Sequence, residues 1–251
     1  MLKITFRTLL SRTHNSHNIG ARMPTNSLLT IGTRASPLAM AQTEEAAARL
    51  SEAHESLSAP DAIRIVKIES TGDKIQDRHL AEIGGKGLFA KELDAALIDK
   101  RIDIAVHSLK DLETRLPDGI ILAACLERED PRDALIGPGL SGLEDIPKGG
   151  TVGTASLRRQ SQLLYHRPDL NITLLRGNIQ TRLRKIRENE VDASFLAFAG
   201  LKRMGLEDKA ACILSTNVMI PACGQGAIGI TCRQNDTIAW QLLKTVNHVE
   251  H

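Results

Sequence analysis

The stretch I-D-I-A-V-H-S-L-K-D at residues 102–111 begins as a short apolar run and ends abruptly in polar side chains. Its apolar part is typical of a parallel β-strand that is covered on both faces. Apolar residues recur at helical spacing just before it, from Phe89 to Leu97. A helix that leads into a buried strand indicates an α/β sheet, in which ligands bind beyond the carboxyl ends of the strands. Lys110 and Asp111 stand at such an end, although a solvated surface ion pair is the simpler interpretation of these two residues alone.

The composition is that of an ordinary globular protein. The chain has 251 residues, of which 42% are apolar and 25% charged, so it has room for one large domain or two medium ones. Its 32 basic and 30 acidic residues give a net charge of +2, and aromatic residues make up 2%. A nucleic-acid-binding protein would need a basic surface or stacking aromatic side chains. No apolar run approaches the roughly 18 residues of a membrane span. We therefore expect a soluble protein that binds neither nucleic acid nor a membrane.

The cysteines predict no metal site. Cys125, Cys212, Cys223 and Cys232 form no C-x-x-C motif and have no histidine at metal-ligand spacing. Reduced thiols are the default for such a set, and they favour a cytoplasmic protein.

The first 27 residues differ in composition from the rest of the chain. They contain several basic residues among Ser, Thr, His and Asn, and the first acidic residue of the chain is Glu44. This composition is compatible with an organellar transit peptide. It fits an over-extended start equally well, with Met23 as the initiator. The expected location is therefore cytoplasmic, or organellar if residues 1–27 are a transit peptide.

Helix and strand signals alternate along the chain. In the first half we expect strands at residues 28–32, 63–68, 102–107 and 120–126, and helices at 37–54 and 88–99. A long polar loop separates them at residues 71–87. The polar cluster E-R-E-D-P-R-D-A at residues 127–134 and the Gly- and Pro-rich segments up to residue 150 are interpreted as a boundary with linkers. Beyond it we expect strands at 151–153, 171–175 and 192–197, and helices at 157–166, 179–188 and up to Arg203. The Gly-rich stretch at residues 221–233 predicts a turn and a strand that returns to the first domain.

The two halves open in a similar way, with I-G-T-R-A-S-P-L at residues 31–38 and V-G-T-A-S-L-R-R at residues 152–159. Each has an apolar strand, then Gly-Thr, then a serine that can cap a helix. Helix N-termini of this kind bind anions. Two of them favour a cleft that holds an anion from both sides, although a generic strand-to-helix turn explains either copy equally well.

The arginines give stronger evidence for an anionic ligand. Six of them are expected near strand ends or helix starts: Arg34, Arg158, Arg159, Arg176, Arg182 and Arg203. A guanidinium group binds a carboxylate through two parallel hydrogen bonds, so several converging arginines indicate a ligand with several carboxylates. Asp111 is expected within this field of cations, where it can stabilise positive charge on a substrate and guide proton transfer.

Together these motifs closely resemble the porphobilinogen deaminase family, whose members are also called hydroxymethylbilane synthases. The matching segments include G-G-K-G-L-F-A-K-E-L, D-I-A-V-H-S-L-K-D, G-T-A-S-L-R-R-Q, L-R-G-N-I-Q-T-R-L and P-A-C-G-Q-G-A, and the similarity extends from residue 31 to residue 233 in family order. The resemblance implies an α/β fold with two periplasmic-binding-protein-like domains around a central cleft. It implies a first domain of residues 28–128 plus 222–246 and a second domain of residues 129–221, after an extension at residues 1–27.

The resemblance also implies an activity. Family members are transferases of tetrapyrrole and haem biosynthesis that condense four porphobilinogen molecules into hydroxymethylbilane and release ammonia, on a covalently held dipyrromethane cofactor. By motif match Asp111 is the catalytic carboxylate, placed beside pyrrole nitrogens and the azafulvene-like cation left after deamination. The implied cofactor contacts are Arg34, Ser36, Ser108, Lys110, Thr154, Ser156, Arg158, Arg159, Arg176, Arg182 and Gln225. The implied substrate contacts are Arg34, Arg176, Arg182 and Arg203, and Lys86 belongs to a lid.

Two departures from the family pattern stand out. Glu82 occupies a lid position at which many members carry lysine. In addition, the family's third domain, an α+β domain, carries the L-E-G-G-C motif whose cysteine holds the cofactor, and none of the four cysteines here lies in that motif. We therefore expect a chain without the third domain and impaired in activity by itself. A monomer is expected. The alternative is a non-catalytic two-lobed protein that binds small anions.

Overall fold

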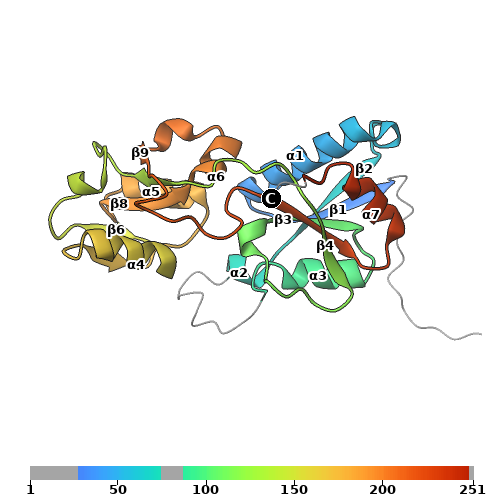
Figure 1. Cartoon of the computed structure of the whole chain (residues 1–251), viewed down its shortest axis with the longest axis horizontal. Coiled ribbons are helices and arrows are strands. Elements are labelled where there is room, and N and C mark those ends of the chain that lie inside the picture. The colour runs from blue at the N-terminus through green and yellow to red at the C-terminus, as the bar shows by residue number, and fades with distance from the viewer. Residues whose placement is uncertain (1–27, 75–86, 249–251) are drawn as a thin grey trace, which may run out of the picture.

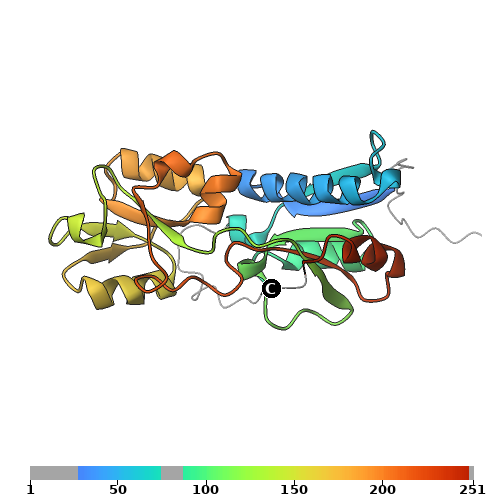
Figure 2. The same ribbon diagram turned by 45° about the horizontal axis from the view of Figure 1, so that its top comes forward.

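The computed structural model describes residues 28–74 and 87–248, so the predictions for residues 1–27, for Lys86 and for Glu82 lie outside the described residues. Figures 1 and 2 show two lobes side by side along the longest axis, each built on a sheet with helices packed around it. Each sheet has five strands. This architecture confirms the predicted α/β class. In the described part of the chain, no helix combines the length and the apolar character that crossing a membrane requires.

The first sheet has the strand order β2-β1-β3-β10-β4. Its strands are β1 (Leu29–Arg34), β2 (Ile63–Ile68), β3 (Ile104–Ser108), β4 (Ile120–Cys125) and β10 (Ile228–Arg233). β1 lies parallel to β2 and β3, whereas β10 lies antiparallel to β3 and β4. The apolar residues of β3 are buried. The late strand β10 therefore completes the sheet that the beginning of the chain starts.

The helices of this lobe are α1 (Pro37–Ala53), α2 (Thr71–Lys74), α3 (Lys91–Ile98) and α7 (Thr237–Lys244), with short 3-10 turns at Glu55–Leu57 and Leu109–Asp111. The start of α1 agrees with the sequence prediction, because the Ser36 hydroxyl accepts a hydrogen bond from the amide of Ala39 at 3.3 Å and Pro37 follows the cap. The predicted polar loop at residues 71–87 was wrong at its beginning, where α2 forms. The helix expected from Leu88 begins only at Lys91, after a turn.

The second sheet has the strand order β7-β6-β8-β5-β9. Its strands are β5 (Asp133–Ile136), β6 (Thr151–Gly153), β7 (Asn171–Thr173), β8 (Ala193–Ala197) and β9 (Cys212–Ile213). The surrounding helices are α4 (Leu157–His166), α5 (Ile179–Arg187) and α6 (Phe198–Arg203), with 3-10 turns at Leu143–Asp145 and Glu207–Lys209. β6 lies parallel to β7 and β8, and β5 lies antiparallel to β8 and β9.

Strand β5 corrects the sequence analysis, which assigned its first residues to a polar linker. Ala134, Leu135 and Ile136 are buried between β8 and β9. This short apolar run was not recognised as a strand because charged residues and Pro131 precede it. Asp133 itself opens the strand with a fully buried side chain. The predicted domain boundaries remain a prediction.

Two segments connect the lobes, and they lie side by side. The amide of Glu129 donates to the carbonyl of Gly226 at 3.2 Å. Gly226 has a φ of +94°, and a Cβ at this position would lie 2.2 Å from the carbonyl oxygen of Glu129. Glycine is therefore required here both for its backbone angle and for the close approach of the two segments.

Replacing Gly226 by alanine is expected to destabilise the protein by about 3 kcal/mol, because the methyl group would collide with a backbone carbonyl and the left-handed φ would be strained. Urea denaturation measures this loss. The matched control is Gly119→Ala, since Gly119 has a φ of +85° but a Cβ there would meet no described atom within 4 Å. The control should lose only about 1 kcal/mol. Equal losses in the two variants would contradict the steric explanation.

Candidate functional site

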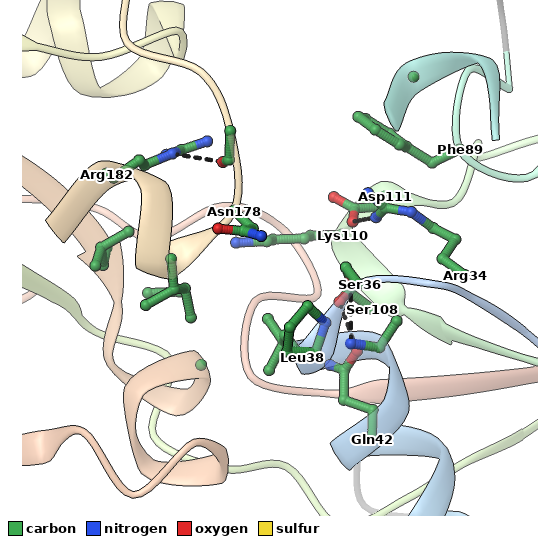
Figure 3. A pocket seen from close by; sticks show the side chains of 18 of the residues that line it. Arg34, Ser36, Leu38, Gln42, Phe89, Ser108, Lys110, Asp111, Asn178 and Arg182 are labelled. Carbon is green, nitrogen blue, oxygen red and sulfur yellow. Dashed lines mark hydrogen bonds and ion pairs between the residues drawn. The ribbon is translucent and has the colours of Figure 1, made fainter. Parts of the chain in front are cut away.

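Both lobes line one cavity of about 580 Å³. Figure 3 shows Arg182 and Asn178 on one side of it, with Arg34, Asp111 and Phe89 on the other. The first lobe contributes residues from the end of β1, the start of α1 and the end of β3. The second lobe contributes the start of α4 and the start of α5. The predicted convergence of strand ends and helix starts from two lobes therefore describes this cavity.

Asp111 lies in the 3-10 turn that follows β3, and its carboxylate faces Arg34. The distance from Arg34 Nη1 to Asp111 Oδ2 is 3.5 Å (Figure 3). The Arg34 guanidinium also lies over the ring of Phe89, 4.2 Å from its centroid. This cation–π contact fixes the plane of the guanidinium. Asp111 keeps 29% of its side chain exposed, so a ligand in the cavity can reach the carboxylate.

Lys110 and Arg182 lie in a strongly cationic environment. The Lys110 ammonium is open to the cavity, yet the walls of the cleft surround it and displace much of its water. This burial, together with Arg159, lowers the pKa of Lys110 to about 8, although Asp111 and Asp133 oppose the shift. Burial and the nearby guanidinium groups of Arg159 and Arg176 lower the pKa of Arg182 to about 10. The cavity therefore holds cations that repel one another and favour an anionic ligand.

A buried carboxylate lies behind the cavity wall, and the sequence analysis missed it. Asp133 accepts hydrogen bonds from Arg158 Nη2 at 2.8 Å, from Arg159 Nη2 at 2.7 Å and from Gln225 Nε2 at 2.8 Å. Burial raises the pKa of Asp133, but the guanidinium groups of Arg159 and Arg158 outweigh this and hold it below its usual value. The sequence held one signal for Asp133, because it is an acidic residue directly before an apolar run.

The predicted site residues fall into two groups. Those that line the cavity are Arg34, Ser36, Ser108, Lys110, Asp111, Ser156, Arg159, Arg176 and Arg182. Ser36 and Ser156 also cap α1 and α4, and Ser108 donates a hydrogen bond to Gln42 at 3.0 Å (Figure 3). Those that do not line it are Thr154, Arg158, Arg203 and Gln225. Lys86 lies outside the described residues.

The residues away from the cavity wall have other partners. Thr154 is buried and accepts a hydrogen bond from the amide of Ser156. Arg203 pairs with Glu45 of α1 at 2.8 Å and donates to the carbonyl of Gly226 at 3.0 Å. Arg203 therefore joins the second lobe to the first and to a connecting segment. Its predicted role as a direct substrate contact stays a prediction.

Several cavity residues were not predicted. Gln42, Phe89, Asn178 and Thr181 line the cavity. Asn178 caps α5 by accepting a hydrogen bond from the amide of Thr181 at 2.9 Å. The sequence held a signal for Gln42, because it is a polar residue on the buried face of α1.

Comparison with known proteins gives the family. The family model described as porphobilinogen deaminase, dipyromethane cofactor binding domain, matches residues 29–241. The chain belongs to the porphobilinogen deaminase family. It is 54% identical over 222 residues to the chloroplastic porphobilinogen deaminase of Oryza sativa subsp. japonica, covering 88% of this chain and 62% of that protein. It is 53% identical over 226 residues to porphobilinogen deaminase of Nitrobacter winogradskyi, covering 90% of this chain and 71% of that protein.

Solved structures confirm the predicted two-lobed fold of periplasmic binding proteins. A periplasmic substrate-binding protein of an ABC transporter from Coxiella burnetii matches with a TM-score of 0.52 at 14% identity, over 87% of this chain and 91% of that one. A nutrient-binding protein from Burkholderia cenocepacia, bound to methionine, matches with a TM-score of 0.52 at 14% identity, over 86% and 90%. At this identity the likeness concerns the fold alone.

The matched domain of the family binds dipyrromethane, and the residues of the cavity fit such a compound. Its acetate and propionate side chains need cationic donors, which Lys110, Arg159, Arg176 and Arg182 supply from two lobes. Arg159 Nε is buried and has no hydrogen-bond partner among the described residues, so one donor of this cavity-lining residue remains unused. The donor set therefore agrees with the family's cofactor.

His107 gives a testable electrostatic feature of the cavity wall. It is buried, and its Nε2 lies 3.0 Å from the hydroxyl of Thr231 on β10. Burial and the charge of Arg34 lower the pKa of His107 to about 4, which keeps the imidazole neutral. A nuclear magnetic resonance titration should show half-protonation near that pH. A midpoint near 6.5, the usual histidine value, would contradict the assignment.

The same shift makes stability depend on pH. The unfolded chain binds a proton at His107 near pH 6.5, whereas the folded chain does so only near pH 4. Stability from the neutral imidazole is thus fully present above pH 6.5 and is lost as the pH falls toward 4. The free energy of unfolding should fall by ~3 kcal/mol more in the wild type than in His107→Gln over this window. Denaturant titrations at both pH values measure the difference.

Proposed function

We propose that this chain carries the catalytic cleft of a transferase that condenses four porphobilinogen molecules into hydroxymethylbilane and releases ammonia, a step of tetrapyrrole and haem biosynthesis. One observation carries the proposal. Among the residues that the structure describes, Asp111 is the one carboxylate in the lining of a cavity whose other charged groups are cations. The family membership and the printed names of the relatives support it.

The cations explain substrate binding. Porphobilinogen carries an acetate and a propionate group, and the growing product carries more of them with each addition. Arg34, Arg176 and Arg182 are the proposed substrate contacts on the cavity wall, and bidentate guanidinium contacts would orient each carboxylate. Arg203 remains a proposed contact that would first have to leave Glu45. Lys86 remains the proposed lid residue.

The same surface would hold the cofactor. Dipyrromethane, when bound, supplies the pyrrole ring to which the first porphobilinogen is joined. Lys110, Arg159 and the hydroxyls of Ser36, Ser108 and Ser156 are the proposed contacts at the cavity, and Thr154, Arg158 and Gln225 support them from behind. The four cysteines all belong to the described part of the chain and none of them lines the cavity, so the proposal assigns the covalent attachment to none of them.

Asp111 is the proposed catalytic residue. When the aminomethyl carbon of porphobilinogen loses ammonia, the bonding electron pair leaves with the nitrogen and positive charge spreads over the ring. A fixed carboxylate beside the pyrrole nitrogen stabilises that charge as it develops. A ring carbon of the second pyrrole then attacks the methylene carbon that lost ammonia, and this attacking carbon releases its proton, which Asp111 can guide away. Arg34 holds the carboxylate in place for both steps.

The proposal also covers the domain bounds, the oligomeric state and the location of the protein. The first domain comprises residues 28–128 and 222–246, the second comprises residues 129–221, and the protein acts as a monomer. It works in the cytoplasm, or in an organelle if residues 1–27 direct it there. The alternative function, a non-catalytic anion binder, accounts for the cations but gives Asp111 no role.

In a protein that joins this chain to the family's cofactor-bearing third domain, Asp111→Asn should reduce turnover of porphobilinogen by at least about 100-fold, because the neutral amide cannot stabilise the developing charge. Consumption of porphobilinogen and release of ammonia measure turnover, and calorimetric titration measures binding. Binding should weaken less than tenfold, since the arginines remain. The matched control is Asp118→Asn, an exposed aspartate outside the cavity, which should behave as the wild type.

Two results would contradict the proposal. The first is near-normal turnover by Asp111→Asn. The second is a wild-type chain that binds succinate, a simple dicarboxylate, as tightly as porphobilinogen. That second result would favour the non-catalytic anion binder.

A further inference from the structure

The buried carboxylate of Asp133 connects two cations on different walls of the cavity. We propose that Asp133 is a positioning residue that fixes Arg159 directly and Lys110 through Gln225, and that it thereby sets the spacing of the cations around the reacting ligand. This inference rests on the proposed function for its catalytic consequence. The hydrogen bonds and charges from which it is drawn do not depend on that function.

Arg159 is held at both terminal nitrogens of its guanidinium group. Its Nη2 donates to Asp133 at 2.7 Å and its Nη1 donates to the carbonyl of Phe195 at 2.9 Å. Both terminal nitrogens are therefore held by the protein, so the orientation of the guanidinium plane is fixed. Arg158 occupies the other oxygen of Asp133 at 2.8 Å, which keeps the carboxylate itself from turning. The buried Nε of Arg159 remains without a partner among the described residues.

Gln225 is 1% exposed and contacts both Asp133 and Lys110. Its Nε2 donates to Asp133 at 2.8 Å and to the carbonyl of Pro131 at 2.7 Å. Because both amide hydrogens are used on that side, the amide oxygen must face the opposite way, where it accepts from Lys110 Nζ at 3.2 Å. Asp133 and the Pro131 carbonyl together therefore decide which end of the Gln225 amide faces Lys110.

The charges give Asp133 a second effect on Lys110. Besides burial, the charged groups acting on the ammonium are Arg159 and Arg182, which lower its pKa, and Asp111 and Asp133, which raise it. Neutralising Asp133 would lower the pKa of Lys110 further. It would also leave two guanidinium groups without their buried counter-charge, which is unfavourable. Lys110 immediately precedes Asp111 in the same 3-10 turn, so the residue that Asp133 positions is adjacent to the proposed catalytic carboxylate.

The test uses Asp133→Asn, which keeps the shape and removes the charge. Carbon-13 resonances of labelled lysine side chains, assigned by comparison with Lys110→Arg, report the titration of Lys110 without any ligand. The midpoint should move to lower pH by roughly one unit in Asp133→Asn. In turnover assays of a protein that also carries the family's third domain, kcat should fall at least about tenfold, with a smaller change in KM, because the substrate arginines are intact.

Asp130→Asn is the matched control. Asp130 lies on the same connecting segment and forms an ion pair with Arg132 at 2.6 Å, but it does not line the cavity. The titration of Lys110 and the turnover should both match the wild type. Circular dichroism establishes that each variant is folded.

Gln225→Met keeps the proposal testable if Asp133→Asn does not fold. It leaves Asp133 with both arginines. It removes the acceptor that favours a charged Lys110, together with the Nε2 donor to Asp133 and Pro131, so the midpoint should again move to lower pH. An unchanged Lys110 midpoint in a folded Asp133→Asn variant, or in Gln225→Met if the first does not fold, would overturn the inference. Near-normal turnover by Asp111→Asn would contradict the proposed function instead, and it would leave this inference standing, because the lysine titration needs no substrate.

Discussion

Repulsion among cations in one cavity is the constraint on which the rest of this structure depends. Lys110, Arg159, Arg176 and Arg182 converge from two lobes, and the lowered pKa values of Lys110 and Arg182 reflect their burial first and then the unfavourable crowding. Two carboxylates offset it. Asp133 neutralises the cluster from behind, while Asp111 faces the cavity. The proposed ligand, rich in carboxylates, would supply the remaining counter-charge and would thereby couple binding to electrostatic balance.

The fold brings these groups together through long-range contacts. The end of β1 supplies Arg34 and the end of β3 leads into Asp111, and β10 holds β3 in register from the other side through backbone pairing and the contact between His107 and Thr231. The two segments that connect the lobes pass close to each other at Gly226, and Gln225 beside it bridges Asp133 to Lys110. Arg203 adds an ion pair from α6 to α1. The cavity thus depends on the relative position of the lobes.

Local signals in the sequence predicted local structure well. The bounds of β6 and α4, and the start of α1 at its serine cap, agree with prediction because each is decided by neighbouring residues. β5 was missed because a short apolar run follows Pro131 and several charges. α7 was also missed, although Asp236 caps it. The motifs predicted most of the cations that line the cavity with Asp111, but they also predicted Arg158 and Arg203, which do not line it. They could not predict that Asp133 would engage Arg158 or that Glu45 would engage Arg203, because those partners are distant in sequence.

The most direct test of the account is a crystal structure of the chain with porphobilinogen bound. The account predicts that the pyrrole nitrogen lies within hydrogen-bond distance of the Asp111 carboxylate. It also predicts that the acetate and propionate groups lie on guanidinium groups from both lobes. A ligand bound outside this cavity, or one whose pyrrole nitrogen faces away from Asp111, would contradict it.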